Sequence, residues 1–239
     1  MSSAPGSGLA PPGQLELVDD AYITKMTAFE VDCNDGKGEP MACHNVGEFF
    51  SVVQDEHARA AKVYKDNCPN YAPSCFNLAR LHLAGRGVPQ DDAEADRLFD
   101  KACKSGKHMA ACYHQGVLSF LSADGKGKSG APRDDKKQQQ ALTLLEKTCR
   151  QGEMDSCYFV GSHLLNPALE PGRRDAAKAL DLLKRACEGN HAPSCYNLAV
   201  LFKNGDVGVE KSEEQYKNYK VRTEELVARY GGLKGRKTA

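Results

Sequence analysis

Apolar side chains recur at helical spacing along most of the chain, in short stretches that are separated by turn residues. In one stretch the apolar positions are Leu78 and Leu81, and the same spacing returns at Leu198, Leu201 and Phe202. Spacings of three and four residues place such side chains on one face of a helix. The pattern therefore predicts a series of short helices, each of which buries a single face.

Each of these first helices is followed by a turn and then by a second, more charged helix. The clearest second helices span residues 91–103 and 174–187, where acidic residues come early and Lys and Arg come late, which complements the helix dipole. A glycine soon afterwards, such as Gly106, Gly152 or Gly189, ends the helix. This helical hairpin occurs five times, in residues 40–70, 71–106, 108–152, 154–190 and 192–230, with approximate bounds.

A helical hairpin cannot bury its own apolar face, whereas stacked hairpins share one continuous core. The sequence thus predicts an all-α fold, a right-handed α-solenoid in which residues 34–230 form the repeats. Residues 15–33 are predicted to form a capping helix, residues 1–14 a disordered lead and residues 231–239 a basic flexible tail. Residues 122–135 are predicted to be an insertion between the helices of the third repeat.

Ten cysteines mark the junctions between the hairpins, in five pairs. The members of a pair are seven to ten positions apart, and the second member lies at the start of a first helix. Four positions later comes a small residue. Gly in a helix interior costs about 1 kcal/mol against Ala, so a small residue at this fixed point indicates close packing of two helices. These small residues are Gly47, Ala79, Gly116, Gly161 and Ala199.

The composition excludes several classes of protein. Lys plus Arg and Asp plus Glu number 32 each, so the net charge is zero and gives no reason to expect binding to nucleic acid or to an anionic membrane. No apolar run approaches the roughly 18 residues of a membrane span. The first 24 residues lack Lys and Arg, and so they resemble neither a secretory signal nor a mitochondrial presequence. The paired cysteines nevertheless indicate an oxidising compartment.

The repeated phrases resemble the Sel1-like repeat family, a relative of the tetratricopeptide repeat. The resemblance covers roughly residues 40–225 and is strongest in the second, fourth and fifth repeats. It rests on Cys-Phe/Tyr-Asn-Leu-Ala at 75–79 and 195–199, on Gly-x-Gly-Val at 85–88, and on an Asp-x-x-Ala helix that ends in Lys-Ala-Cys at Cys103.

Cysteine at the repeat junctions marks a subset of this family that has secreted bacterial members and mitochondrial members. The five pairs, the additional N-terminal helix and the lack of a signal make this chain more similar to the mitochondrial members. That resemblance implies a monomeric, non-enzymatic scaffold of the mitochondrial intermembrane space that supports cytochrome c oxidase assembly. It implies protein clients of respiratory-chain assembly and the oxidative import machinery as partners, with no membrane insertion. A secreted cysteine-rich repeat protein is the alternative.

The positions of the cysteines allow two regular pairing schemes. One joins the members of each close pair, and the other joins the start of a first helix to the end of the following second helix, as in Cys43/Cys68. The family resemblance implies the first scheme. Its disulfides are Cys33–Cys43, Cys68–Cys75, Cys103–Cys112, Cys149–Cys157 and Cys187–Cys195.

No catalytic constellation is recognisable in the sequence, and no cofactor or metal is predicted. The cysteines lack the close Cys-x-x-Cys spacing that structural zinc sites and thiol oxidoreductases favour. Gly127-Lys128-Ser129 resembles the end of a P-loop, but Ser122 stands where the first glycine is required. Thiol redox chemistry, or a haem or copper site formed by Cys and His, is the alternative to a scaffold. The histidines are scattered at His44, His57, His82, His108, His114, His163 and His191.

The positions two residues after each second cysteine are candidates for partner binding, because stacked repeats present the same position of each first helix along one face. Asn45, Asn77 and Asn197 could hydrogen-bond an extended peptide there, and His114 occupies the equivalent position. The alternative is that the asparagines bond within the scaffold while the neighbouring aromatic residues pack between helices.

Overall fold

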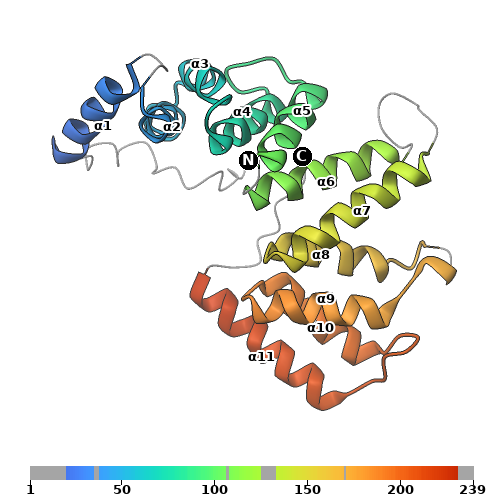
Figure 1. The fold of residues 1–239 in the computed structure, drawn as a ribbon. Coiled ribbons are helices and arrows are strands. Elements are labelled where there is room, and N and C mark those ends of the chain that lie inside the picture. The colour runs from blue at the N-terminus through green and yellow to red at the C-terminus, as the bar shows by residue number, and fades with distance from the viewer. Residues whose placement is uncertain (1–19, 35–37, 106–107, 125–132, 170, 231–239) are drawn as a thin grey trace, which may run out of the picture. The chain divides into compact units, whose positions relative to one another are not determined.

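The computed structural model describes residues 20–34, 38–105, 108–124, 133–169 and 171–230, and these residues form helices and turns without a named β-strand (Figure 1). The predicted all-α class is therefore confirmed. Several predicted segments lie outside the described residues. They are the lead, the first residues of the capping helix, Gly106, residues 125–132 of the insertion, which include Gly127–Ser129, and the basic tail.

The helices follow one another in hairpins, as the sequence predicts. Their bounds are α1 Asp20–Cys33, α2 Pro40–Glu48, α3 His57–Asn67, α4 Ala72–Ala84, α5 Asp92–Lys104, α6 Met109–Ala123, α7 Asp135–Arg150, α8 Met154–Leu164, α9 Ala176–Glu188, α10 Ala192–Asn204 and α11 Glu213–Tyr230. A π-helix, η3 (Phe49–Val53), continues α2, and a 3₁₀ turn, η4 (Pro171–Arg173), precedes α9.

Packing divides the chain into two compact units, with the division between Gln115 and Gly116 inside α6. In the first unit, α1 packs on α2, α2 on α3, α3 on α4 and α4 on α5. In the second unit, the same succession runs from α7 to α11. Each helix thus contacts mainly the helices before and after it, as expected for stacked hairpins.

Three of the second helices, α5, α7 and α9, follow an aspartate whose side chain caps the helix. Asp91 accepts hydrogen bonds from the backbone N–H groups of Ala93 and Glu94 at 3.0 and 2.9 Å. Asp134 and Asp175 cap α7 and α9 in the same way, through one N–H group each. Such caps satisfy donors that the first helical turn leaves unpaired, and each contributes about 1 kcal/mol.

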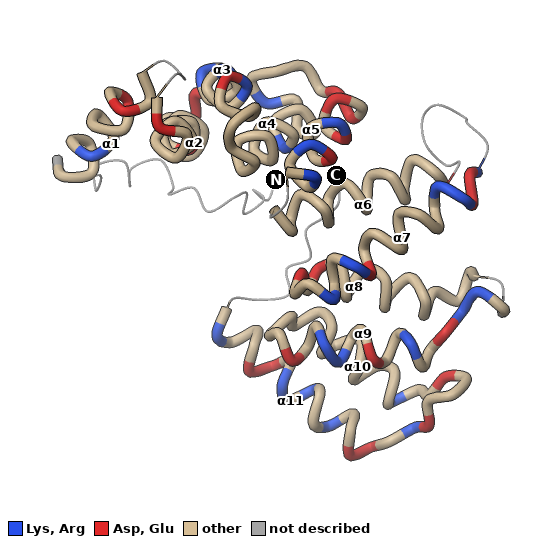
Figure 2. The backbone as a smooth tube through the Cα atoms, viewed as in Figure 1, with Lys and Arg blue, Asp and Glu red and all other residues tan. Residues whose placement is uncertain are grey.

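Charge is concentrated on these second helices (Figure 2). Among the first helices, α6 carries no charged residue, and Arg80 is the one charged residue of α4. The second helices α5, α7, α9 and α11 carry both signs along their length. The first helices α2, α8 and α10 also carry one charged residue each, so the first helices as a group carry much less charge than the second helices.

The small residue four positions after each second cysteine lies where a first helix meets the second helix of its hairpin. A Cβ atom on Gly116 would lie 2.7 Å from Cγ of Leu145, and one on Gly161 would lie 2.8 Å from Cγ of Leu183. A Cβ atom on Gly47 would overlap the ring of Tyr64. The prediction of close helix packing at this position is confirmed.

The structure brings the sulfur atoms together in the five close pairs, with Cα atoms 4.5–4.8 Å apart. Each pair joins the end of one hairpin, or of α1, to the first turn of the next hairpin. Nine of the ten cysteines are buried, and Cys103 is half-buried. The oxidised state of all ten cysteines in the native protein stays a prediction.

We expect Gly161→Val to lower the free energy of unfolding by about 1–3 kcal/mol, because the added methyl groups would overlap Leu183. Urea denaturation measures this change. Adding Leu183→Ala to the same chain should make the loss smaller than the sum of the two single losses. Gly172→Ala is the control, since no atom lies within 4 Å of the added carbon. Equal stability of Gly161→Val and wild type would contradict the packing.

We also expect alkylation of unreduced protein from its native source to label no cysteine, and alkylation after reduction to label ten. Each short loop should contribute about 2–3 kcal/mol in the chain-entropy model, so reduction should lower the melting temperature strongly. Mass spectrometry counts the labels, and an absorption spectrum of the same sample reports any bound haem. Free thiols or a haem band would favour the redox or haem alternative.

Candidate functional site

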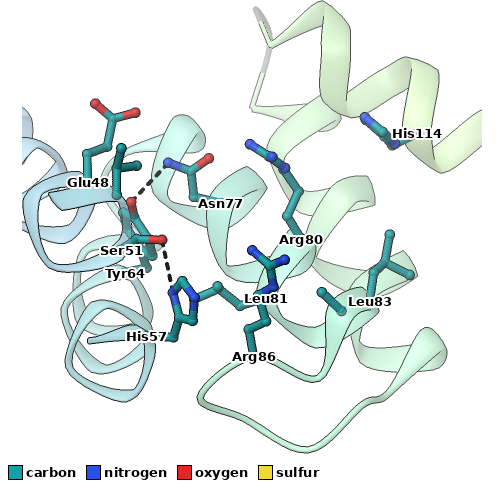
Figure 3. A pocket seen from close by; sticks show the side chains of 12 residues that line it. Glu48, Ser51, His57, Tyr64, Asn77, Arg80, Leu81, Leu83, Arg86 and His114 are labelled. Carbon is teal, nitrogen blue, oxygen red and sulfur yellow. Dashed lines mark hydrogen bonds between the residues drawn. The ribbon is translucent and has the colours of Figure 1, made fainter. Parts of the chain in front are cut away.

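The first unit contains a cavity of about 400 Å³ between α2, η3, α3 and α4, with one side chain from the start of α6 (Figure 3). Its apolar lining is supplied by Val52, Leu81, Leu83 and Ala84. Its polar lining consists of Glu48, Ser51, His57, Tyr64, Asn77, Arg80, Arg86 and His114.

One wall of the cavity exists because α2 widens into the π-helix η3. The Gln54 N–H donates to the Phe49 carbonyl oxygen at 3.1 Å, a bond that spans five residues rather than four. Phe49 and Phe50 are buried by this arrangement, while Val52 is 47% exposed at the cavity. Single π-turns occur frequently at functional sites. The π-helix therefore gives the first hairpin a wall that a regular α-helix would not provide.

The opposite wall is formed by the end of α4. Gly85 ends this helix in the left-handed region, with φ of 62°, and the Arg86 N–H donates to the Leu81 carbonyl oxygen at 3.0 Å. Gly87, with φ of 69°, lies against the backbone of His57 so closely that a Cβ atom would not fit. This turn fixes Arg86 directly beside the first turn of α3.

Tyr64 and Asn77 form the floor of the cavity. The Tyr64 residue is 1% exposed, and its hydroxyl accepts a hydrogen bond from Nδ2 of Asn77 at 3.2 Å. Burial raises the pKa of the Tyr64 phenol, and the bond from Asn77 opposes that rise only in part. The phenol is therefore neutral at physiological pH and presents a fixed hydroxyl group.

Ser51, His57 and Asp55 form a hydrogen-bonded series at the side of the cavity. Nδ1 of His57 lies 3.4 Å from Oγ of Ser51, and Nε2 lies 3.0 Å from Oδ1 of Asp55. The tautomer that satisfies both contacts donates from Nε2 to Asp55 and accepts at Nδ1 from Ser51. The Asp55 side chain is 77% exposed, unlike the buried acid of a serine-hydrolase triad. The series thus orients the hydroxyl group of Ser51 at the cavity.

The charges of the cavity are unevenly distributed. Arg80 and Arg86 are exposed and form no ion pair with any described residue. Glu48, on the other wall, lies 3.6 Å from Nε2 of His44 and is 52% exposed. The cavity therefore offers two uncompensated guanidinium groups on the α4 side and one carboxylate on the α2 side (Figure 3).

The four predicted partner-binding residues do not converge. Asn77 and His114 line the cavity, and the ring of His114 stacks on Phe99 with centroids 5.0 Å apart. Asn45 is half-buried on α2 and is not part of the lining. Asn197, in the second unit, donates from Nδ2 to Oγ of Ser162 at 2.9 Å. Asn77 and Asn197 thus both bond within the scaffold, and a role in partner binding stays a prediction.

Sequence reasoning missed Arg80, Arg86, Ser51 and Tyr64. For Arg80 a signal was available, since it is the one charged residue in a helix that is otherwise apolar or neutral. For Ser51 none was available, because its position depends on the π-helix. Tyr64 belongs to a second helix, and only the close approach of Gly47 brings it into the first-helix wall.

The cysteines and several histidines are engaged in contacts within the scaffold. Every cysteine is paired, and among the described residues no group of three or more His, Cys, Asp or Glu side chains is arranged to hold a metal ion. Several histidines instead pack against aromatic rings of a neighbouring hairpin. Such pairs are His44 with Tyr71, His108 with Phe76, and His191 with Tyr158.

Burial lowers the pKa of His44 and His108 below the ordinary value of 6.5. The unfolded chain therefore binds protons at these residues more readily than the folded one, and stability should fall as the pH drops below about 6.5. We expect the melting temperature to decrease between pH 7.5 and 5.5, and to decrease less in His44→Gln with His108→Gln. An unchanged pH slope in the double variant would contradict this assignment.

Comparison with protein families and with known proteins identifies the repeats. The Sel1 repeat model matches residues 72–107, 109–153, 155–191 and 192–215, which is more than half of the chain. The hairpin that contains α2 and α3 lies before the first matched range. The resemblance was expected to be weaker in the first and third repeats; the first lies outside the matched ranges, whereas the third is matched over residues 109–153.

Similar curated proteins cover most of the chain. The cytochrome c oxidase assembly factor 7 of Xenopus tropicalis is 28% identical over 227 residues, covering 92% of this chain and 93% of its own. The human protein of that name is 29% identical over 208 residues, covering 83% and 71%. The Drosophila melanogaster homolog is 25% identical over 236 residues, covering 83% and 85%.

Solved structures share the fold at lower identity. A Sel1 repeat protein from Oxalobacter formigenes superposes with a TM-score of 0.66 at 19% identity, covering 84% of this chain and 79% of the other. The immunity protein PA5088 from Pseudomonas aeruginosa superposes with a TM-score of 0.54 at 15% identity, covering 92% and 84%. Together with the family match, these results show that the chain belongs to the Sel1 repeat family.

Proposed function

We propose that this protein is a non-catalytic Sel1 repeat scaffold that acts as an assembly factor for cytochrome c oxidase. The proposal is carried by the similarity to proteins named cytochrome c oxidase assembly factor 7, which extends over 92% of the chain. It is supported by the stacked hairpins, which expose an extended surface suited to binding other proteins. The partners are then protein clients of respiratory-chain assembly, and the protein acts as a monomer.

The proposed compartment is the mitochondrial intermembrane space. Five close cysteine pairs need an oxidising environment to form and persist, and disulfides are rare in the cytosol. The oxidative import machinery of that compartment is accordingly a second partner. Among the described residues, no helix has the length and apolar character needed to cross a membrane.

Deletion of the gene should reduce cytochrome c oxidase activity severalfold in isolated mitochondria while leaving the activities of the other respiratory complexes closer to normal. The reason is that an assembly factor limits the amount of one enzyme rather than the flux through all of them. Spectrophotometric assays of each complex, with citrate synthase as the reference, measure the effect. Re-expression of the wild-type chain should restore the activity. A normal cytochrome c oxidase level in the deletion strain would reject the proposed function.

The compartment is tested separately by protease treatment of mitochondria. The protein should resist protease in intact mitochondria and be degraded once the outer membrane is ruptured. A matrix protein would remain protected after rupture, and a secreted protein would be absent from the organelle.

A further inference from the structure

We propose that the cavity of the first unit binds an acidic, extended segment of a partner protein, with a carboxylate held by Arg80 and Arg86. This inference rests on the proposed scaffold function and adds the chemistry of the segment that is recognised. The predicted partner-binding residues Asn77 and His114 line this cavity, whereas the two arginines were not predicted from the sequence.

Two arginines lie at this cavity. Arg80 is on α4, and Arg86 follows directly after this helix. Neither side chain forms an ion pair with a described residue, although elsewhere in the unit Arg59 and Arg97 pair with the neighbouring Glu56 and Glu94. A pair of arginines left without acidic partners at a cavity is suited to a ligand that supplies the negative charge.

Carboxylate fits this pair better than other anionic groups of macromolecules. Guanidinium groups form two parallel hydrogen bonds with a carboxylate, and the donors of Arg are held in a fixed plane. A nucleic-acid backbone would require a longer basic track, whereas the chain has zero net charge and Glu48 lies on the opposite wall of the same cavity. The positive charge is therefore local and suits one or two acidic side chains.

The remaining lining indicates a peptide rather than a small free anion. Leu83 and Ala84 provide apolar contact on the α4 side with the arginines, and Val52, which is 47% exposed, provides it on the η3 side. The amide of Asn77 and the hydroxyl of Ser51 are half-buried groups able to bond a peptide backbone. Such a surface suits a segment that carries an acidic residue and an apolar residue close together.

The walls that would hold this segment are fixed before it binds. Tyr64 is bonded to Asn77, and His57 is bonded to both Ser51 and Asp55. These internal hydrogen bonds limit the side-chain freedom that would be lost on binding, which improves affinity for a given contact area. Glu48 would orient the bound segment, because its carboxylate repels a second acidic residue on the α2 side of the cavity.

A random twelve-residue peptide display library tests the inference on the full oxidised chain. Peptides selected on wild-type protein should be enriched in Asp and Glu, and the best one should bind Arg80→Gln with Arg86→Gln about five- to thirtyfold more weakly, as expected for two partly exposed charge pairs. Fluorescence anisotropy measures the affinity at several salt concentrations, and binding should weaken as salt rises. Replacing Glu and Asp of the peptide by Gln and Asn should abolish the preference for wild type.

The matched control is Lys65→Gln with Lys101→Gln, which removes the same charge from a separate depression of the first unit. Its affinity for the selected peptide should be within about twofold of the wild-type affinity if the two arginines act by direct contact rather than by long-range electrostatic attraction. Glu48→Gln should bind it equally well or a few times more tightly. All substituted residues are exposed, so the melting temperatures of the variants should match that of wild type.

Three outcomes of these experiments would overturn the inference. The library could yield neutral or basic peptides, it could yield no peptide whose binding depends on Arg80 and Arg86, or the lysine control could weaken binding to the same extent. An equally arginine-dependent affinity for a twelve-nucleotide single strand would also overturn it. In deletion cells, full rescue of cytochrome c oxidase by Arg80→Gln with Arg86→Gln would reject the cavity and leave the proposed function intact. A normal enzyme level in the deletion cells would reject the proposed function while the peptide selection still stands.

Discussion

The contact between the two helices of each hairpin is the interaction on which the rest of the structure depends. At the small residue four positions after the second cysteine, the backbone of a first helix lies directly against a large side chain of the second, such as Leu145 or Leu183. This close approach buries one side of each helix and leaves another apolar side that a single hairpin cannot cover. Each hairpin therefore needs the next one, which explains why helices contact mainly their neighbours in sequence.

The cysteine pairs lie at the junctions between successive hairpins, where one hairpin packs on the next. They are also part of the core, since Cys187 and Cys195 pack with Leu183, Leu198 and Leu226 in one apolar cluster. Five disulfides of about 2–3 kcal/mol each would be large against a typical total stability of about 5–15 kcal/mol. They would hold successive hairpins in register where each hairpin contacts mainly its neighbours. The stability of the fold would then depend on the oxidation state of the thiols.

The candidate site arises where the regular repeat is broken. In the first hairpin α2 continues as a π-helix, Asp55 adopts a φ of 57°, and α3 begins only at His57. Backbone of this kind is costly and tends to persist where a site requires it. The other wall is an ordinary repeat feature, the glycine turn after α4. An irregular wall facing a regular one gives the first unit a cavity whose polar groups come from α2, η3, α3, α4 and α6 and from the turn after α4.

The sequence by itself determined the helical hairpins, their number and the position of close packing, because these follow from local periodicity and from the small residue at a fixed place. Arg80 also stood out in principle, as the one charged residue of α4. The tertiary structure alone decided that Arg86, Ser51 and Tyr64 share a cavity with it, and that Asn77 bonds to Tyr64 while Asn45 lies elsewhere. The physical reason is that periodicity assigns a residue to one face of its own helix. Which faces of different helices line the same cavity depends on the π-helix η3 and on the close approach of Gly47 to Tyr64.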